Sequence, residues 1–269
     1  MLSNESSPKH VEDAEFSSRR TKRLKPYAAL VFCGLIAVVG WAMMSLTSSP
    51  GMKGAALLWL PAALQLIAGV WLGPTLGMIA GGLGAYAAGI LAYGGWGLAD
   101  IIMNPIAGGI ANSLLPALLF RLLRINPDFG AKSNVSNLNV AFVRIGGTVI
   151  AVLVLSIIVL RVFPHLGPWG YIPQALILLA ALYSLSQEHK GGLRVRDLYL
   201  AIAICFLASF LSASIGVVGA IVGGLTLRAA IISVGIGWFA GDTISSLLGL
   251  YALAALTKKA RERGICDDI

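Results

Sequence analysis

The chain has 269 residues, of which 57% are hydrophobic and only 12% are charged. Soluble domains contain about 25% charged residues, so this composition excludes an ordinary water-soluble domain and favours a protein with many membrane-spanning helices. The formal net charge is +8. The positive residues lie in the predicted tails and short loops and form no basic, aromatic-rich surface. The lipid bilayer is therefore the expected partner, and nucleic acid is not.

The N-terminal stretch is mostly polar and ends in the basic run RRTKRLK. The apolar run that follows is about twenty residues long, which is too long for a signal-peptide core, and no A-x-A cleavage pattern closes it. We therefore predict a disordered basic cytoplasmic tail over residues 1–24, a single transmembrane helical domain over residues 25–257 and a short cytoplasmic tail over residues 258–269.

Eight apolar segments follow one another along the chain, and about twenty apolar residues are enough for a helix to cross the hydrocarbon layer. They are Lys25–Leu46, Ala55–Leu72, Thr75–Tyr93, Ala99–Leu123, Asn139–Val162, Trp169–Leu185, Leu198–Val218 and Leu227–Leu256. This pattern predicts an all-α, polytopic membrane bundle of about eight transmembrane helices. The second and third segments almost touch at Gly73-Pro74. A tight turn at the membrane surface and a broken re-entrant pair both fit that junction.

The charges between the segments predict the orientation of the chain. If the N-terminus is cytoplasmic, that side receives RRTKRLK, two basic loops and the tail KKARER, whereas the opposite side receives few cations, among them Lys53 and Arg228. This asymmetry is what the positive-inside rule describes. An even number of crossings keeps both basic termini on one side. We therefore predict a multi-pass protein of the cell membrane with both termini in the cytoplasm.

Small residues are concentrated in two places. The third segment carries a row that repeats every four positions, and it consists of Gly77, Gly81, Ala85 and Gly89. A second run, SASIGVVGAIVGG, precedes the last segment. Such rows let helix backbones approach closely in lipid, and they can also line a narrow cavity, so both roles stay open. The two halves of the chain are loosely similar, because each has a Gly-rich segment followed by one that carries an Asp.

Asp242 lies near the middle of the last apolar segment, and Trp238 lies one turn earlier on the same helix face. A carboxylate at that depth costs about 3 kcal/mol on insertion scales, so it should face the protein interior, a cavity or a cation. A ligand or ion contact is one interpretation. The other is structural, either an ion pair, for which Arg144 is the candidate partner, or a cap where the helix breaks at Gly237 or Gly241.

Uncharged amides occur at similar depth in other segments. Asn104 and Asn112 lie about two helical turns apart and project from nearly the same face. Gln65 lies between Trp59 and Trp71, two indoles whose spacing suits the two interfacial belts of a membrane. Amides in lipid bind either a neighbouring helix or a ligand. We predict a ligand-binding set of Gln65, Asn104, Asn112, Trp238 and Asp242.

The sequence contains no motif for enzymatic chemistry or for metal binding. The cysteines and histidines are scattered, without the spacing of a zinc site, and no phosphate-binding loop, HExxH or paired intramembrane carboxylates occur. The run GGLGAY is similar to part of a nucleotide fingerprint but lies inside an apolar segment. We therefore expect no catalytic residues, no metal and no cofactor, and a protein that is not an enzyme.

The stretch GVWLGPTLGMIAGGLGAYAAGIL, followed by IANSLLPALLFRLL, resembles the S components, the substrate-binding subunits of energy-coupling-factor vitamin transporters. The matching residues are Gly69, Trp71, Gly73, Pro74, Gly77, Gly81 and Gly84. The resemblance implies a membrane protein that binds a vitamin or similar metabolite and passes it inward together with membrane and ATPase subunits. The family has six spans in a shorter chain, whereas this sequence predicts eight.

A second resemblance covers more of the chain, from Trp59 to Leu250, and is to the MASE1 membrane sensory domain, which has eight predicted spans. Its elements here are WLP, ANSLLPALLFRLL, RDLYL, FLSASIGV and GWFAGDTISSLLGL. This resemblance implies a bundle that signals to a cytoplasmic partner such as a kinase or cyclase.

The leading hypothesis is thus an integral membrane protein that binds and takes up a small molecule and depends on a separate ATPase module. The ligand would approach from the outer side, beneath the loops YGGWG and RVFPHLGPWG. The alternatives are a MASE1-like sensor and a stand-alone secondary carrier in which Asp242 couples to a proton or cation.

Overall fold

The computed structural model describes residues 8–47, 58–94, 97–130, 147–148, 150–152, 154–155, 158–159, 162, 169–170, 172–188 and 194–266. Within these ranges the regular elements are helices, and no strand is present. They are α1 (Pro8–Thr47), α2 (Pro61–Leu72), α3 (Pro74–Tyr93), α4 (Leu98–Ile101), η1 (Ile102–Leu114), α5 (Leu115–Leu122), α7 (Ile172–Glu188), α8 (Val195–Val222), α9 (Leu227–Ala230), η3 (Ile231–Gly235) and α10 (Ile236–Glu262). The elements η1 and η3 are π-helical, and each continues an α-helix on both sides.

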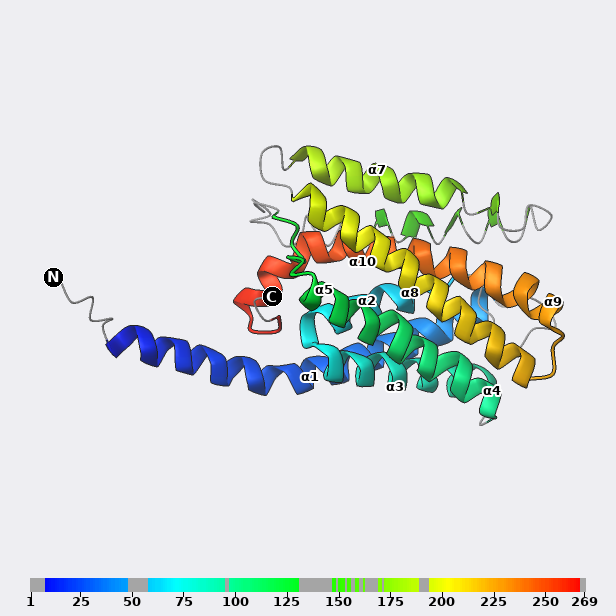
Figure 1. Ribbon diagram of the computed structural model, residues 1–269, viewed down its shortest axis with the longest axis horizontal. Coiled ribbons are helices and arrows are strands. Elements are labelled where there is room, and N and C mark those ends of the chain that lie inside the picture. The colour runs from blue at the N-terminus through cyan, green and yellow to red at the C-terminus, as the bar shows by residue number, and fades with distance from the viewer. Residues whose placement is uncertain are drawn as a thin grey trace.

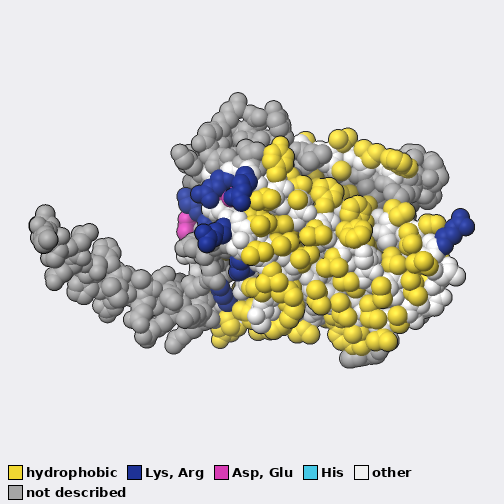
Figure 2. All heavy atoms as spheres, viewed as in Figure 1, with side chains coloured by type: hydrophobic (Ala, Val, Ile, Leu, Met, Phe, Trp, Pro, Cys, Tyr) yellow, Lys and Arg dark blue, Asp and Glu magenta, His cyan; other side chains and the backbone are white. Residues whose placement is uncertain are grey.

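Five helices are long and apolar enough to cross a membrane. They are Leu24–Leu46, Pro74–Tyr93, Leu98–Leu122, Arg196–Val222 and Leu227–Glu262. Their outer faces carry large apolar side chains, and hydrophobic groups cover most of the visible flank of the bundle in Figure 2. A helical bundle with such a surface is a membrane protein, because water would not solvate that flank.

The short helix α2 lies at the centre of the bundle. It packs against α1, α3, η1 and α10, and most of its residues are buried. α3 packs on η1, η1 on α8, and α8 on α10, while α7 lies along the outside of α10 (Figure 1). The bundle therefore surrounds α2 with helices from both halves of the chain.

The second predicted segment, residues 55–72, is not one membrane-spanning helix. Residues 55–57 lie outside the described residues, residues 58–60 are not helical, and α2 has only 12 residues. At 1.5 Å per residue it is about 18 Å long, which is too short to cross the hydrocarbon layer. The irregular backbone ahead of it is tolerated at this depth because Leu58 and Leu60 are buried within protein.

The junction at Gly73 is a tight turn. Gly73 has φ +97°, which glycine adopts without strain, and it ends α2 and begins α3. A proline stands at the first position of each of these two helices, where a missing N–H costs nothing. The backbone at Gly73 is therefore a tight turn, while the choice between a full turn between spans and a re-entrant break stays a prediction.

The N-terminal part of the chain differs from the prediction. α1 begins at Pro8, so residues 8–24, expected to be disordered, belong to the same helix as the first apolar segment. Figure 1 shows this part extending away from the bundle, on the side where the C-terminus also lies. Polar composition predicted disorder, but the stretch contains no glycine, and its Pro8 lies at the helix start, where it is tolerated.

The remaining predicted segments are described in part. The predicted segment 169–185 corresponds to α7, and the segment 139–162 falls largely outside the described residues. The count of eight spans therefore stays a prediction, as does the cytoplasmic placement of the termini.

Positive side chains gather at the end of the bundle where the C-terminus lies, which we call the basic end (Figure 2). Its described residues are Arg121, Arg124, Arg194, Arg196, Lys258, Lys259, Arg261 and Arg263. The Arg261 guanidinium donates to Asp128 Oδ2 and to Asn126 Oδ1, both at 2.7 Å. These hydrogen bonds hold the loop after α5 against the last turns of α10 at the basic end.

Candidate functional site

Four polar side chains from four different helices meet inside the bundle. Asn112 Nδ2 lies 3.2 Å from Gln65 Oε1, 3.3 Å from Asp242 Oδ2 and 3.5 Å from Ser212 Oγ. Gln65 comes from α2, Asn112 from η1, Ser212 from α8 and Asp242 from α10. All four are at most 2% exposed. We call this group the polar cluster.

Glycines make room for the polar cluster. The Nε2 of Gln65 donates to the carbonyl of Gly81 on α3 at 3.4 Å. A Cβ atom at Gly108 of η1 would come within 2.5 Å of that same nitrogen. A larger residue at either glycine would therefore displace Gln65 or separate the helices, so the small residues here serve both close packing and the polar cluster.

The helix that carries Asn112 is distorted over thirteen residues. η1 has π-type hydrogen bonding, and Pro105 inside it cannot donate a backbone hydrogen bond. Ser113 Oγ donates to the carbonyl of Gly108 at 3.0 Å, which satisfies one of the carbonyls that this distortion leaves available. π-helical turns are rare and occur frequently at functional sites.

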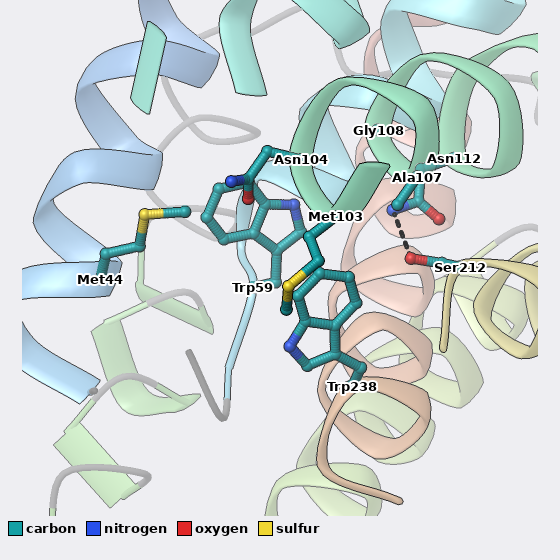
Figure 3. A pocket seen from close by; sticks show the side chains of 9 residues that line it. All are labelled: Met44, Trp59, Met103, Asn104, Ala107, Gly108, Asn112, Ser212 and Trp238. Atoms are coloured by element: carbon teal, nitrogen blue, oxygen red, sulfur yellow. Dashed lines mark hydrogen bonds between the residues drawn. The ribbon is translucent and has the colours of Figure 1, made fainter. Parts of the chain in front are cut away.

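A narrow cavity opens beside the polar cluster (Figure 3). Its lining residues are Met44, Trp59, Met103, Asn104, Ala107, Gly108, Asn112, Ser212 and Trp238. The cavity volume is about 10 Å³, which is room for about one water molecule.

The cavity lies toward the end of the bundle opposite the basic end. Met44 is near the C-terminal end of α1, and Met103 and Asn104 are in the first turn of η1, just after α4. Figure 1 shows α4 at the far end of the bundle from the C-terminus. Asn112 and Ser212 lie deeper, so these two members of the polar cluster form the floor of the cavity.

Two acceptor oxygens of the polar cluster have no hydrogen-bond partner among the described residues, Asn112 Oδ1 and Asp242 Oδ1. No ion pair of Asp242 occurs among those residues either. The predicted ion-pair partner Arg144 lies outside them. The alternative that Asp242 caps a helix break is wrong, because α10 continues through Gly237 and Gly241 without interruption.

The structure brings the predicted residues into one neighbourhood. Gln65, Asn112 and Asp242 are members of the polar cluster. Asn104, Asn112 and Trp238 line the cavity, as expected for two amides on nearly the same face. Six residues that sequence reasoning missed complete the wall and floor, Met44, Trp59, Met103, Ala107, Gly108 and Ser212. Ser212 was detectable as a hydroxyl inside the small-residue run, whereas nothing in the sequence distinguishes the two methionines.

The two tryptophans whose spacing suits the membrane interfaces both make contacts inside the protein. Trp59 precedes α2 and lines the cavity. Trp71 is buried, and its Nε1 donates to Thr257 Oγ1 of α10 at 3.0 Å. A buried indole usually finds an acceptor of this kind for its N–H group.

The chemistry of this site suits reversible recognition. Among the described residues, no group of three or more His, Cys, Asp or Glu side chains could hold a metal ion. The site offers amide and hydroxyl groups on its floor and indole and thioether groups on its walls, and the Asp242 carboxyl group is bonded to Asn112 beside it. Such a combination orients a small solute through a few polar contacts while apolar walls exclude water.

The fold and this cavity define a helical integral membrane protein with a polar-floored interior site. No family model matches the chain, and no curated protein or solved structure is similar enough to count as a match. The likeness to S components and to MASE1 domains therefore stays a prediction from the residues that suggested it.

Proposed function

We propose that the protein binds a small molecule in this cavity and serves its uptake across the cell membrane, in the manner of an S component. The observation that supports this most directly is the meeting of Gln65, Asn112, Ser212 and Asp242 beside a cavity that Asn112 and Ser212 line. A purely structural polar contact between helices would satisfy its members, whereas here two acceptor oxygens lack donors among the described residues.

The distribution of charge supports an orientation for this proposal. Cytoplasmic ends of membrane helices are enriched in Lys and Arg. We therefore propose that the basic end lies in the cytoplasm together with both termini and that the cavity mouth faces outward, on the side of Arg228. We propose eight crossings, the second of which is made by α2 together with the residues ahead of it.

Transport by this route needs a source of energy. Because the sequence contains no phosphate-binding loop, we propose that separate membrane and ATPase subunits supply it, as they do for S components. A cytoplasmic kinase or cyclase as the co-purifying partner would instead favour a MASE1-like sensor.

The test is to identify the small molecules that stay bound to the protein during purification. The full-length protein is purified from its native host in mild detergent, and bound small molecules are identified by mass spectrometry. Asn112→Leu removes the central donor of the polar cluster, while Ser245→Ala removes a buried hydroxyl that bonds only its own helix, to Gly241 O at 2.8 Å. We expect one compound in near-equal amount with the wild-type and Ser245→Ala proteins and its loss from Asn112→Leu. No compound in any sample, or equal amounts in all three, contradicts the proposal.

A second candidate is a stand-alone secondary carrier, and the buried carboxylate of Asp242 favours it. An ionisable group at this depth that lacks an ion-pair partner among the described residues is typical of coupling sites. In that case purified protein in liposomes would take up solute down an ion gradient without ATP, and Asp242→Asn would abolish the uptake. Uptake that requires ATP and partner subunits excludes this candidate.

A further inference from the structure

We propose that the basic end carries a site for the phosphate headgroup of an anionic membrane lipid, formed by Arg124, Arg194 and Arg196 where α5 ends and α8 begins. This surface is separate from the cavity, so the inference does not rest on the proposed function. Four observations support it: the unpaired charges, the backbone that holds them, the conformation of Arg124 and the exposed apolar residues nearby.

The three arginines have little counter-charge within the part of the chain that the structure describes. Arg124 and Arg196 are exposed and form no ion pair with a described residue. Arg194 lies 3.9 Å from Asp197 Oδ2, a long contact that leaves its side chain 62% exposed. The ligand that suits three such groups is an anion, and the planar guanidinium matches the oxygens of a phosphate group well.

Two hydrogen bonds hold the loop after α5 against the start of α8. The N–H of Arg194 donates to the carbonyl of Phe129 at 2.8 Å, and the N–H of Asn126 donates to Asp197 Oδ2 at 3.3 Å. Phe129 is itself buried, which anchors the loop in the bundle. Arg124 lies two residues before Asn126, so it is held beside the first turn of α8, which carries Arg196. Because this backbone is already fixed, a bound anion has little of it left to order.

Arg124 occupies a backbone position that glycine fills best. Its φ is +51°, in the left-handed region. It follows α5 in a Schellman motif, in which the N–H of Arg124 donates to the carbonyl of Arg121 at 3.1 Å and the N–H of Ile125 to the carbonyl of Phe120 at 2.8 Å. Glycine adopts this conformation without the Cβ clash that arginine meets. An exposed arginine held at a cost to stability is expected where its side chain serves binding.

The apolar residues beside the arginines favour a lipid over a soluble anion or an acidic protein. Leu122, two residues before Arg124, is 76% exposed, and Tyr199, about one turn after Arg196, is 69% exposed. Both belong to helices that are long and apolar enough to cross a membrane, so they contact acyl chains, and tyrosine is typical of the headgroup level. Figure 2 shows the cations of the basic end beside the hydrophobic flank. Arginines at that level meet lipid phosphates, and basic sites at the cytoplasmic surface bind anionic headgroups.

The experiment is a titration of the full-length protein in a neutral detergent with phosphatidylglycerol, with phosphatidylcholine of the same acyl chains and with inorganic phosphate. The melting temperature reports stabilisation, and native mass spectrometry counts the lipids that stay bound. We expect phosphatidylglycerol to raise the melting temperature saturably and to leave one tightly held lipid. Phosphatidylcholine, whose choline cancels the phosphate charge, and inorganic phosphate, which has no acyl chain, should do neither.

Arginine variants locate the site. Arg124→Gln and Arg196→Gln should each raise the concentration of phosphatidylglycerol that gives half of the effect about 5-fold. The matched control is Arg228→Gln, which removes the same charge beside α9, at the opposite end of the bundle (Figure 1), and should leave that concentration unchanged.

Arg124→Gly separates the side chain from the backbone. Without anionic lipid it should melt about 2–4 °C above the wild type, because glycine suits the left-handed conformation, and this also shows that it is folded. Its response to phosphatidylglycerol should fall as in Arg124→Gln. A melting temperature at or below that of the wild type would contradict the claim that arginine is kept here at a cost.

The remaining outcomes are equally decisive. Equal effects of the two lipids, an unchanged response of the arginine variants, or the same weakening by Arg228→Gln each overturns the site. If inorganic phosphate alone reproduces the effect, or if the arginine variants lose a co-purifying acidic protein while binding lipid normally, the lipid assignment fails. None of these results concerns a compound that co-purifies in an Asn112-dependent manner, so the proposed function can stand when this inference fails.

Discussion

The close contact between α2 and α3 predicts a specific effect of adding one methyl group. A Cβ at Gly77 of α3 would lie 2.8 Å from the backbone nitrogen of Gly69 and 2.9 Å from the carbonyl oxygen of Ala68, both on α2. Ordinary contacts of this kind begin near 3.4 Å. The neighbouring atoms belong to a helix backbone and cannot rotate away. Gly69 Cα would lie closer still, so Gly77→Ala must push the two helices apart by more than about 0.6 Å, the difference between 3.4 and 2.8 Å.

The expected size of the effect follows from two opposing contributions. Overpacking of a tight contact costs about 1–3 kcal/mol, and replacing glycine by alanine inside a helix returns up to about 1 kcal/mol. The net loss should be about 1–2 kcal/mol, or a fall in melting temperature of about 2–8 °C for a chain of this size. Gly34→Ala is the matched control, because no atom lies within 4 Å of a Cβ built at that position. It should be neutral or stabilising by up to about 1 kcal/mol.

Both variants are purified in the same detergent and unfolded by titration with sodium dodecyl sulfate, with helicity followed by circular dichroism. The contrast between the two alanines is the quantity of interest, since detergent effects are common to both. If Gly77→Ala is as stable as Gly34→Ala, the backbones of α2 and α3 do not approach as closely as described here, and the central position of α2 is wrong.

Three further predictions concern other parts of the bundle. Trp71→Phe and Thr257→Val should each lower the free energy of unfolding by about 1 kcal/mol. The double variant should lose less than the sum, because both substitutions remove the same 3.0 Å hydrogen bond. Additive losses in detergent unfolding would refute that coupling. Arg261→Gln should loosen the loop that holds Asp128, seen as faster hydrogen exchange there and not around α9. A cysteine introduced at Arg228 should react with a membrane-impermeant maleimide in intact cells, while an N-terminal tag should be digested only after the cells are opened; the reverse pattern would invert the proposed orientation.

The helical bundle could be predicted from the sequence because a chain segment that crosses lipid has few alternatives to a helix. Backbone groups in hydrocarbon must bond within the chain, so a long apolar stretch is a helix almost by necessity. The five helices able to span a membrane accordingly lie within predicted segments or overlap them closely. The same reasoning failed for α2, since apolar composition does not distinguish a lipid-facing helix from irregular backbone buried in protein. Leu58 and Leu60 are apolar because they are buried, although they are not helical.

The site could be predicted in part for a related reason. A polar side chain at membrane depth must face inward, which was enough to single out Gln65, Asn112 and Asp242 before their contacts were known. The walls could not be found this way. Met44 and Met103 are apolar, as lipid-facing residues also are, and only the packing of the helices places them at the cavity. The contact of Trp59 with the cavity was missed because the prediction assumed a regular helix before residue 61.

The loose similarity between the halves of the sequence has a counterpart in the structure. In each half a Gly-rich helix is followed by a four-residue helical turn with an N-cap, a π-helical stretch and a further α-helix. In the first half these elements are α3, α4, η1 and α5, and in the second half they are α8, α9, η3 and α10. Asn112 follows the cap at Gly97 by 15 positions, and Asp242 follows the cap at Thr226 by 16 positions. The two side chains that bond across the centre of the bundle therefore come from nearly corresponding places.

This correspondence bears on mechanism. Transporters built from repeats place their substrate site near mid-membrane, between the repeats, at helices whose α-helical pattern is interrupted. Here η1 and α10 both pack on α8 and on α2, and the bond from Asn112 to Asp242 at 3.3 Å bridges them at the cavity floor. A ligand that bonds to these two side chains competes directly with the link between the two halves. Binding at this floor would thus be coupled to the separation of the halves, which is the movement that uptake from the outer side requires and that a static scaffold would not need.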